Sequence, residues 1–159
     1  ASSTRNITGV YDLAGGLWER TASYVANGHE NLFKYGKSVA YEEDVLKITS
    51  TEYTMVYPYD SNVDNDTKED SMDNLNAASN ANYARNTKIY GDAIRETSTG
   101  GTDSNSWENA SSNFSSLSYL FIVKGGGLWY NSNVGRFFFG RDSGNCNFYY
   151  GFRPVIVPV

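Results

Sequence analysis

The chain has 159 residues, a formal net charge of −5 at pH 7 and a sequence pI of about 4.8. Its length is that of one ordinary domain, and an acidic chain without a basic stripe argues against a nucleic-acid partner. No apolar run reaches the ~20 residues of a transmembrane helix and no signal-peptide pattern opens the chain, so we predict no membrane insertion and interpret Ala1 as a mature start or a boundary chosen for expression.

The sequence contains one cysteine, Cys146, and one histidine, His29. These counts exclude an internal disulfide, a multi-thiolate metal site and a poly-histidine metal centre within the chain. The 13 tyrosines and 15 glycines, together with many Asn and Ser residues, are typical of adaptable binding loops. They are equally typical of a secreted all-β or loop-rich domain.

In chain order, the first predicted element is a strand over residues 17–26, bounded by the turn signals Gly15-Gly16 and Asn27-Gly28. Its residues alternate between two faces: Leu17, Glu19, Thr21, Ser23 and Val25 on one, and Trp18, Arg20, Ala22, Tyr24 and Ala26 on the other. His29, beside Glu30, is predicted to be a surface or helix-start residue rather than a catalytic base.

The acidic stretch 59–73 predicts a solvated loop rather than a calcium site, because the EF-hand spacing is not met. Thr67 is a predicted cap for a short helix that ends near Asn80. Residues 98–118 predict an irregular loop, with Trp107 and Phe114 anchoring it to the core.

Four short strands are predicted after this loop: residues 119–123, stopped by the glycine triplet 125–127, then 128–130, 136–139 and 149–157. Alternation requires that some of Phe137, Phe138 and Phe139 belong to the core. Pro154 and Pro158 favour an edge position for the last strand. The pattern predicts one α+β domain over residues 1–159, with several short strands, one or two helices and long irregular loops.

Two glycine-tryptophan blocks carry a resemblance to a known family. Residues 6–19, NITGVYDLAGGLWE, resemble the N-x-x-G-L-Y-D-M-x-G-N-V-W-E-W signature of formylglycine-generating-enzyme-like (sulfatase-modifying-factor) domains. Residues 124–129, KGGGLW, then Arg141 and the GFRPV of residues 151–155 resemble that family's R-G-G-S-W … R … G-F-R close. The blocks cover about a third of the chain, and the family's usual N-terminal portion does not precede them. This leaves open whether the chain is the C-terminal part of a longer protein.

The resemblance implies a C-type-lectin-like fold, with a small mixed or antiparallel sheet, one or two helices and long irregular loops. It also implies that Trp18 and Trp129 are core residues and that Arg141 and Arg153 form structural hydrogen-bond forks.

The resemblance further implies that the chain is not an enzyme. The two catalytic cysteines of the family's oxidases align with Tyr130 and Gly135, and a phenol and a glycine cannot perform thiolate chemistry. Cys146 lies too far along the chain to replace them and is predicted to be a small loop residue. The related iron-dependent sulfoxide synthases need several histidines. We therefore predict no redox cofactor.

Members of the oxidase type hold calcium beside the first block. Position by position, the ligands implied here are the carboxylates of Asp12 and Glu19 and the backbone carbonyls of Gly15 and Leu17, which are hard oxygen donors of the kind that calcium requires. The family's Asn after the glycine is Gly16 in this chain. The alternative is that Asp12 caps a turn and Glu19 pairs with an arginine.

The segment 130–150 is similar to the diversified ligand-binding segment of diversity-generating-retroelement variable proteins and phage tropism determinants. It contains no Lys, Glu, Gln, Met or Trp, the residue types that codons randomised at adenine and ending in C cannot encode. An ordinary lectin-fold loop is the alternative. Rigid aromatic rings among Asn and Ser suit a binding surface. The predicted ligand-binding residues are Tyr130, Asn131, Ser132, Asn133, Asn145, Asn147, Phe148, Tyr149 and Tyr150.

The function expected from these features is non-catalytic recognition of a protein or glycan on a cell surface. We expect the domain to be extracellular, on a cell surface or on a virion such as a phage tail. One rival interpretation is a structural module of a surface, pilin-like or phage-tail assembly. The other is a divergent oxidase, which the missing thiols disfavour.

Overall fold

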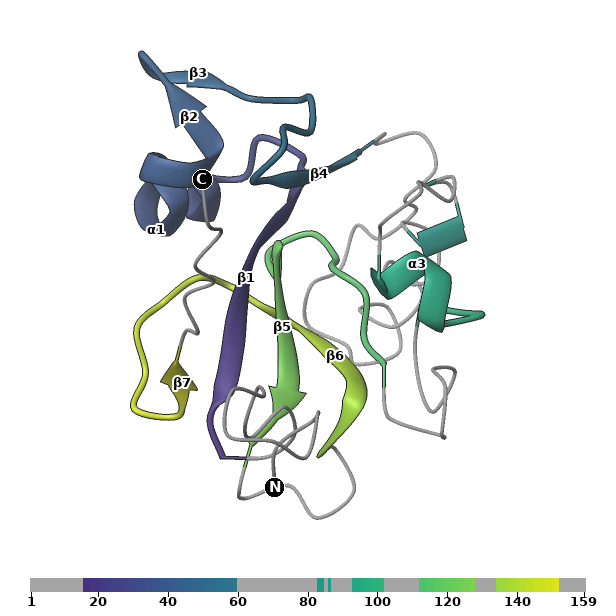
Figure 1. The fold of residues 1–159 in the computed structure, drawn as a ribbon. Helices are drawn as coiled ribbons and strands as arrows, with labels where there is room; N and C mark the ends of the chain where they lie inside the picture. Colours follow the sequence, from purple (N-terminus) through teal and green to yellow (C-terminus); the bar gives the residue numbers. More distant parts are fainter. Residues whose placement is uncertain are drawn as a thin grey trace, which may run out of the picture.

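The computed structural model describes residues 16–59, 83, 84, 86, 93–101, 112–127 and 134–151. It has an α+β architecture, in which a curled mixed sheet of five strands is accompanied by one longer helix, one short helix and a small two-stranded hairpin (Figure 1). The predicted α+β class with a small mixed sheet is thereby confirmed. The elements are β1 (Trp18–Ala26), α1 (Glu30–Ala40), β2 (Tyr41–Glu42), β3 (Val45–Leu46), β4 (Met55–Pro58), α3 (Ala93–Thr97), β5 (Phe121–Gly126), β6 (Val134–Asp142) and β7 (Tyr150–Gly151).

Strand β1 is the centre of the sheet, whose order is β4-β1-β5-β6, with β7 also paired to β1. It runs antiparallel to β5 and parallel to both β4 and β7. Strand β7 pairs with the start of β1, at Trp18 and Glu19, whereas β4 pairs with its end, from Ser23 to Ala26. Side chains of β1 can therefore reach the loops at both ends of the sheet.

The alternation predicted for β1 is confirmed, and it divides the core into two clusters on opposite faces of the strand. The buried residues of the first cluster are Val25, Tyr57, Tyr83, Ile94, Phe114, Ile122 and Phe139. Those of the second are Tyr24, Leu32, Ala40, Val56, Leu120 and Phe121. Because both faces are covered, successive residues of a strand can be buried together. Phe138 and Phe139 are both buried for this reason, and Phe114 anchors its loop as predicted.

Helix α1 begins at the predicted helix-start residue. His29 is its N-cap, and the Nδ1 atom of His29 accepts a hydrogen bond from the backbone N–H of Asn31 at 3.1 Å. The backbone departs from helical geometry at Gly36, which packs so closely on Phe121 that an added Cβ would lie 2.5 Å from the ring. The helix therefore lies against β5 with a glycine at the contact.

Strand β5 departs from the prediction at both ends. It begins at Phe121 rather than Tyr119, and it continues through the first two glycines of the triplet instead of stopping there. Gly125 and Gly126 have positive φ angles of 85° and 76°, and the pairing with β6 shifts register between Lys124 and Gly126. The glycines therefore permit a β-bulge within the strand, which a sequence pattern does not distinguish from a strand end.

Several predictions fall outside the described residues: the helix from Thr67 to Asn80, the anchor Trp107, the core residue Trp129, the strand over 128–130, and Arg153, Pro154 and Pro158. Of the predicted strand over 149–157, the described part is β7 at Tyr150–Gly151. In the described part of the chain, no helix combines the length and the apolar character needed to span a membrane.

Candidate binding surface

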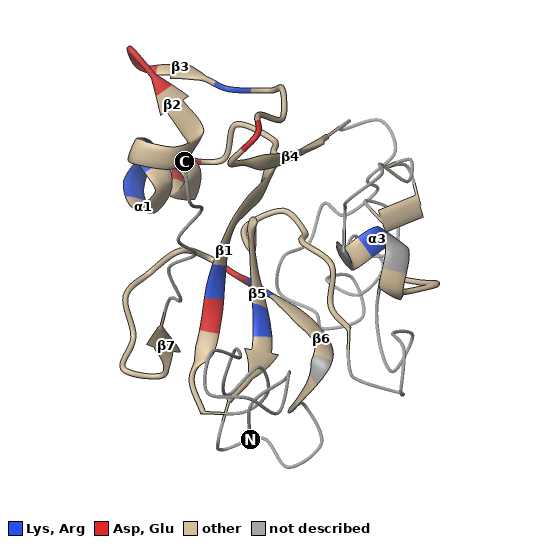
Figure 2. Ribbon diagram, viewed as in Figure 1, with Lys and Arg blue, Asp and Glu red and all other residues tan. Residues whose placement is uncertain are grey.

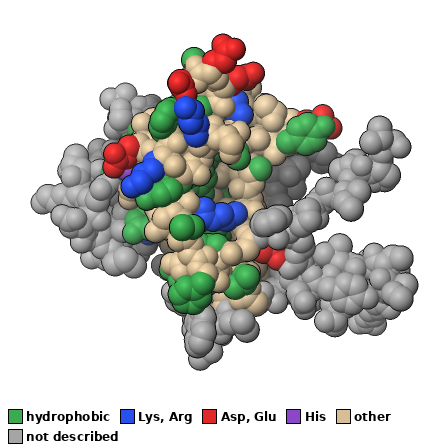
Figure 3. Space-filling view, turned by 90° about the vertical axis from the view of Figure 1, so that its left-hand side faces the viewer, with side chains coloured by type: hydrophobic (Ala, Val, Ile, Leu, Met, Phe, Trp, Pro, Cys, Tyr) green, Lys and Arg blue, Asp and Glu red, His purple; other side chains and the backbone are tan. Residues whose placement is uncertain are grey.

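The loop between β6 and β7, residues 143–149, carries most of the predicted ligand-binding residues that the structure describes. Asn145, Asn147, Phe148 and Tyr149 lie in this β6–β7 loop, and Tyr150 follows it as the first residue of β7. The other predicted residues, Tyr130, Asn131, Ser132 and Asn133, lie outside the described residues. Figure 3 shows the side of the molecule that carries α1 and β7, where hydrophobic side chains lie among Lys and Arg side chains.

Arg20, on β1, holds the first residues of the β6–β7 loop in place. Its guanidinium donates hydrogen bonds to the backbone carbonyl oxygens of Gly144, at 2.6 Å, and Asn145. It also lies 2.7 Å from a carboxylate oxygen of Asp142, the last residue of β6. Figure 2 shows a basic and an acidic position next to each other on β1, in blue and red. One planar group with several donors thus ties the loop backbone to the central strand.

Asp142 completes this arrangement, and its side chain is only 4% exposed. Its carboxylate accepts hydrogen bonds from the backbone N–H of Gly144, at 3.0 Å, and from the hydroxyl of Tyr150. A buried carboxylate needs such partners, because an unpaired charge away from water is strongly unfavourable. We call Arg20, Asp142 and the loop backbone that they hold the arginine clamp.

A series of aromatic rings lies over the clamp. The ring centroid of Trp18 is 5.6 Å from that of Tyr150, Tyr150 is 5.0 Å from Tyr149, and Tyr149 is 5.1 Å from Phe148. The Arg20 guanidinium lies over the Tyr150 ring at 4.6 Å from its centroid. Trp18, Tyr150 and Tyr149 are half-buried, whereas Phe148 at the end of the series is 80% exposed. The inner rings therefore support an outer ring that is free to meet a partner.

Trp18 departs from the prediction that it is a core residue. It is half-buried, and its ring contacts Phe138 beneath and Tyr149 and Tyr150 above. It lies within the aromatic series because β7 pairs with the start of β1, which places Tyr150 directly opposite Trp18 in the sheet. Arg141, predicted to form a hydrogen-bond fork, places its guanidinium 5.7 Å from the ring centroid of Tyr119.

Tyr150 is held in its neutral form by its surroundings. Burial, followed by the hydrogen bond to Asp142, raises the pKa of the Tyr150 hydroxyl well above its ordinary value of 10.0. The unfolded chain ionises this hydroxyl near pH 10, whereas the folded protein resists ionisation. The neutral Tyr150 hydroxyl therefore makes its full contribution to the free energy of unfolding below pH 10. This contribution is lost as the pH rises above that value, because only the unfolded chain then ionises readily.

We expect the wild-type protein to lose stability between about pH 10 and pH 11.5 more steeply than the Tyr150→Phe variant. The measurement is urea denaturation at several pH values, with Tyr53→Phe as the control because Tyr53 is exposed. Equal slopes for the wild type and the Tyr150→Phe variant would show that the folded protein does not suppress this ionisation.

Cys146 is exposed in the β6–β7 loop, in agreement with its prediction as a loop residue. It lines an open pocket of about 280 Å³ together with Arg20, Gly144, Asn147, Tyr150 and Gly151. The pocket lies directly beside the clamp, so a ligand group that enters it would meet the edge of the aromatic series.

The predicted calcium ligands are only partly described. Asp12 and Gly15 lie outside the described residues, whereas Leu17 is exposed and Glu19 is half-buried. Glu19 lies opposite Lys124 on β5, so these oppositely charged residues are cross-strand neighbours. Within the described ranges, no three or more His, Cys, Asp or Glu residues are grouped closely enough to hold a metal ion.

Arg20 and Asp142 were not among the site residues predicted from the sequence. Nothing in their local patterns marks them, because Arg20 occupies one position of an alternating strand and Asp142 follows a run of aromatic residues. The register of β1, β5 and β6 brings them together.

In comparisons with known proteins, the chain matches no family model, no curated protein and no solved structure.

Proposed function

We propose that this chain is a non-catalytic recognition domain with a C-type-lectin-like fold, which binds a protein or glycan partner outside the cell or on a virion. The binding surface is the β6–β7 loop and the aromatic series beside it. The observation that carries the proposal is that the loop with the 80% exposed Phe148 is fixed by Arg20, which is paired with the buried carboxylate of Asp142.

Rigidity is the physical reason why this arrangement favours recognition. Ordering a flexible loop upon binding costs conformational entropy, which a loop fixed in advance avoids. The clamp holds the loop through its backbone, and Phe148 adds a large apolar contact with few rotatable bonds. Asn145 is exposed in the same loop and supplies polar atoms for orienting a partner.

Two features support a non-catalytic role. Gly135, at one of the positions that align with the oxidase thiols, lies in β6 and carries no reactive group. The single thiol, Cys146, lies exposed in the loop, and the single histidine, His29, caps α1.

We expect Phe148→Ala and Tyr149→Ala each to weaken binding of the partner at least tenfold, because exposed aromatic rings at the centre of an interface contribute about 2 kcal/mol or more. Labelled protein is screened on a glycan array and an array of surface proteins. Each interaction found is then measured with the purified variants, whose free energies of unfolding should change little.

Phe33→Ala is the matched control, since Phe33 is an exposed aromatic residue on α1 whose ring packs on Tyr41 rather than on the aromatic series. Binding lost in the loop variants but retained in Phe33→Ala supports recognition by the β6–β7 loop. Binding that survives both loop variants, or an absence of binding on both arrays, contradicts it and favours the structural-module interpretation.

Calcium is proposed as a second element of the site, held by Asp12, Glu19 and the carbonyls of Gly15 and Leu17. We expect calcium to raise the Tm relative to excess chelator, because an ion bound only by the folded state stabilises it. Thermal unfolding of wild type and Glu19→Gln checks this expectation, with Glu42→Gln as a control for the loss of an exposed carboxylate. An unchanged Tm in the wild type excludes Asp12 and Glu19 as ligands.

A further inference from the structure

A second pocket lies beside β1, at the end where β4 joins the sheet. It has a volume of about 290 Å³, near the lower end of the range of small-molecule sites, about 300–1,000 Å³. Thr21 and Ser23 contribute to its lining, and it shares no lining residue with the pocket beside Arg20. The pocket is therefore separate from the proposed recognition surface.

One part of the pocket presents hydrogen-bond acceptors. Thr21 uses its one hydroxyl proton in a hydrogen bond of 2.9 Å to the backbone carbonyl of Ile122. Ser23 must therefore donate in the short contact between the two hydroxyls. With both protons committed, these oxygens can only accept from a ligand. Glu52 adds a carboxylate at the same pocket.

The loop that carries Glu52 is fixed before any ligand arrives. The Thr51 hydroxyl oxygen accepts hydrogen bonds from the backbone N–H groups of Tyr53, at 3.2 Å, and Thr54, at 3.1 Å. The backbone of Thr51 and Thr54 closes the same turn with a 2.9 Å hydrogen bond. Little ordering of this loop is then required when a ligand binds.

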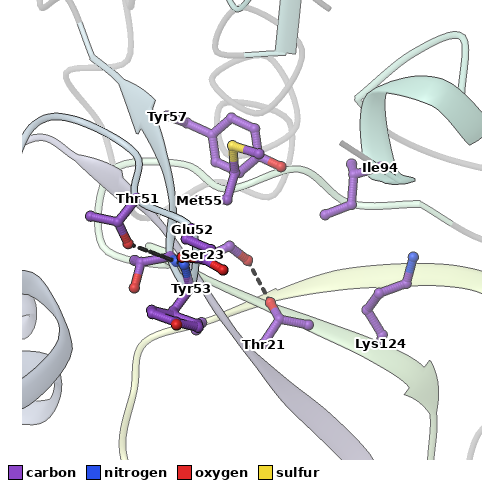
Figure 4. A pocket seen from close by; sticks show the side chains of 11 residues that line it. Thr21, Ser23, Thr51, Glu52, Tyr53, Met55, Tyr57, Ile94 and Lys124 are labelled. Carbon is purple, nitrogen blue, oxygen red and sulfur yellow. Dashed lines mark hydrogen bonds between the residues drawn. The ribbon is translucent and has the colours of Figure 1, made fainter. Parts of the chain in front are cut away.

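The remaining lining differs in character. Met55, Tyr57 and Ile94 form an apolar wall, and Lys124 enters from β5. Figure 4 shows Glu52 and Lys124 on opposite sides of the pocket, with Met55 and Tyr57 across from Thr21. Lys124 already takes part in another contact, but an ammonium group has three N–H donors, so it can also donate to a ligand.

We propose that this pocket binds a free α-amino acid with an apolar side chain. A primary ammonium has three N–H donors, which match the three acceptors Thr21, Ser23 and Glu52. The ligand carboxylate is bound by Lys124, and the apolar side chain packs on Met55, Tyr57 and Ile94. Because Glu52 and Lys124 carry opposite charges, the pocket suits a ligand with both an ammonium and a carboxylate better than a ligand with only one of them.

The test compares three probes that share one apolar body. L-leucine is the zwitterion, 3-methylbutylamine lacks its carboxylate, and 4-methylpentanoate lacks its ammonium. Each is titrated into the ¹⁵N-labelled chain, and Kd is obtained from shifts of the amide signals of residues 21–23 and 51–55. We expect leucine to bind about tenfold more tightly than either of the other two, because each loses one charged hydrogen-bonding group.

Two substitutions assign the charged partners. Glu52→Gln should raise Kd about fivefold for leucine and the amine but not for 4-methylpentanoate, because Glu52 is exposed and its charge is partly screened. Lys124→Met should weaken leucine and 4-methylpentanoate but not the amine. Glu42→Gln, an exposed carboxylate in the hairpin, and Phe148→Ala should leave all three Kd values unchanged.

The proposal is overturned by any of three results. They are no saturable shift with leucine by about 10 mM, equal binding of all three probes, and tighter binding of methyl glucoside than of leucine. Because Phe148→Ala is included, a failure of this proposal is distinguishable from a failure of the recognition surface.

Discussion

Replacing Arg20 by methionine is expected to lower the free energy of unfolding by about 3 kcal/mol. The substitution leaves the buried carboxylate of Asp142 without its cation and two loop carbonyls without their donor, and removal of one partner of a buried pair costs about 3–5 kcal/mol. The lower end applies because the Arg20 side chain is 29% exposed. Urea denaturation monitored by tyrosine and tryptophan fluorescence measures the change.

The chain provides a matched control for the arginine clamp. Lys37 and Asp44 form an ion pair of 2.6 Å whose side chains are 53% and 67% exposed. Lys37→Met should cost less than about 1 kcal/mol, because water screens exposed pairs. Arg20→Lys keeps the charge but not the planar fork, so its effect should fall between those of the two methionine variants. Similar losses for Arg20→Met and Lys37→Met would contradict a structural role for the clamp.

The second large effect is expected at Gly144, the clamped residue of the loop. Its φ angle is +101°, and an added Cβ would lie 2.5 Å from the Phe121 ring and 2.6 Å from the Cβ of Tyr35. Gly144→Ala combines backbone strain, about 1–2 kcal/mol, with overpacking of 1–3 kcal/mol in order of magnitude. We expect a loss of about 3 kcal/mol in urea denaturation, together with loss of partner binding, because the loop must move away from α1 and β5.

Gly28→Ala separates the two causes of this loss. Gly28 also has a positive φ, +76°, but an added Cβ would meet no atom within 4 Å. Its substitution should cost only the backbone strain, about 1 kcal/mol. If both variants lose the same stability, the close contact of Gly144 with Phe121 and Tyr35 contributes nothing. Gly144→Ala combined with Phe121→Leu should recover part of the loss if the contact is responsible.

The sequence predicted β1 and the α+β class because alternation of side chains in a strand is a local property. It predicted the start of α1 at His29 but not the helix itself. The buried residues of that helix are Leu32, Gly36 and Ala40, and two of these are too small to produce a hydrophobic periodicity. The helix is held by close approach to Phe121 rather than by an apolar stripe, and such an approach is visible only in three dimensions.

The candidate site divides in the same way. Phe148, Tyr149 and the neighbouring Asn residues could be selected from composition, because aromatic and amide side chains concentrated in a loop are typical of binding surfaces. The supporting role of Tyr150 could not be predicted from composition, because its hydroxyl donates a hydrogen bond to Asp142, which lies on another strand. The acceptor pocket at Thr21 and Ser23 was also missed, because the direction of each hydroxyl bond depends on the packing of β1 against β5.

The clamp also determines which substitutions the loop can accept. Arg20 holds carbonyl oxygens, which every amino acid carries, and it takes no side-chain atom of Asn145. Replacement of the exposed side chains at Asn145 and Phe148 therefore leaves the support beneath them intact, whereas Gly144 and Asp142 admit almost no change. Under the proposed function, the outer side chains can therefore be exchanged, and a different partner bound, while the backbone beneath them keeps its fold.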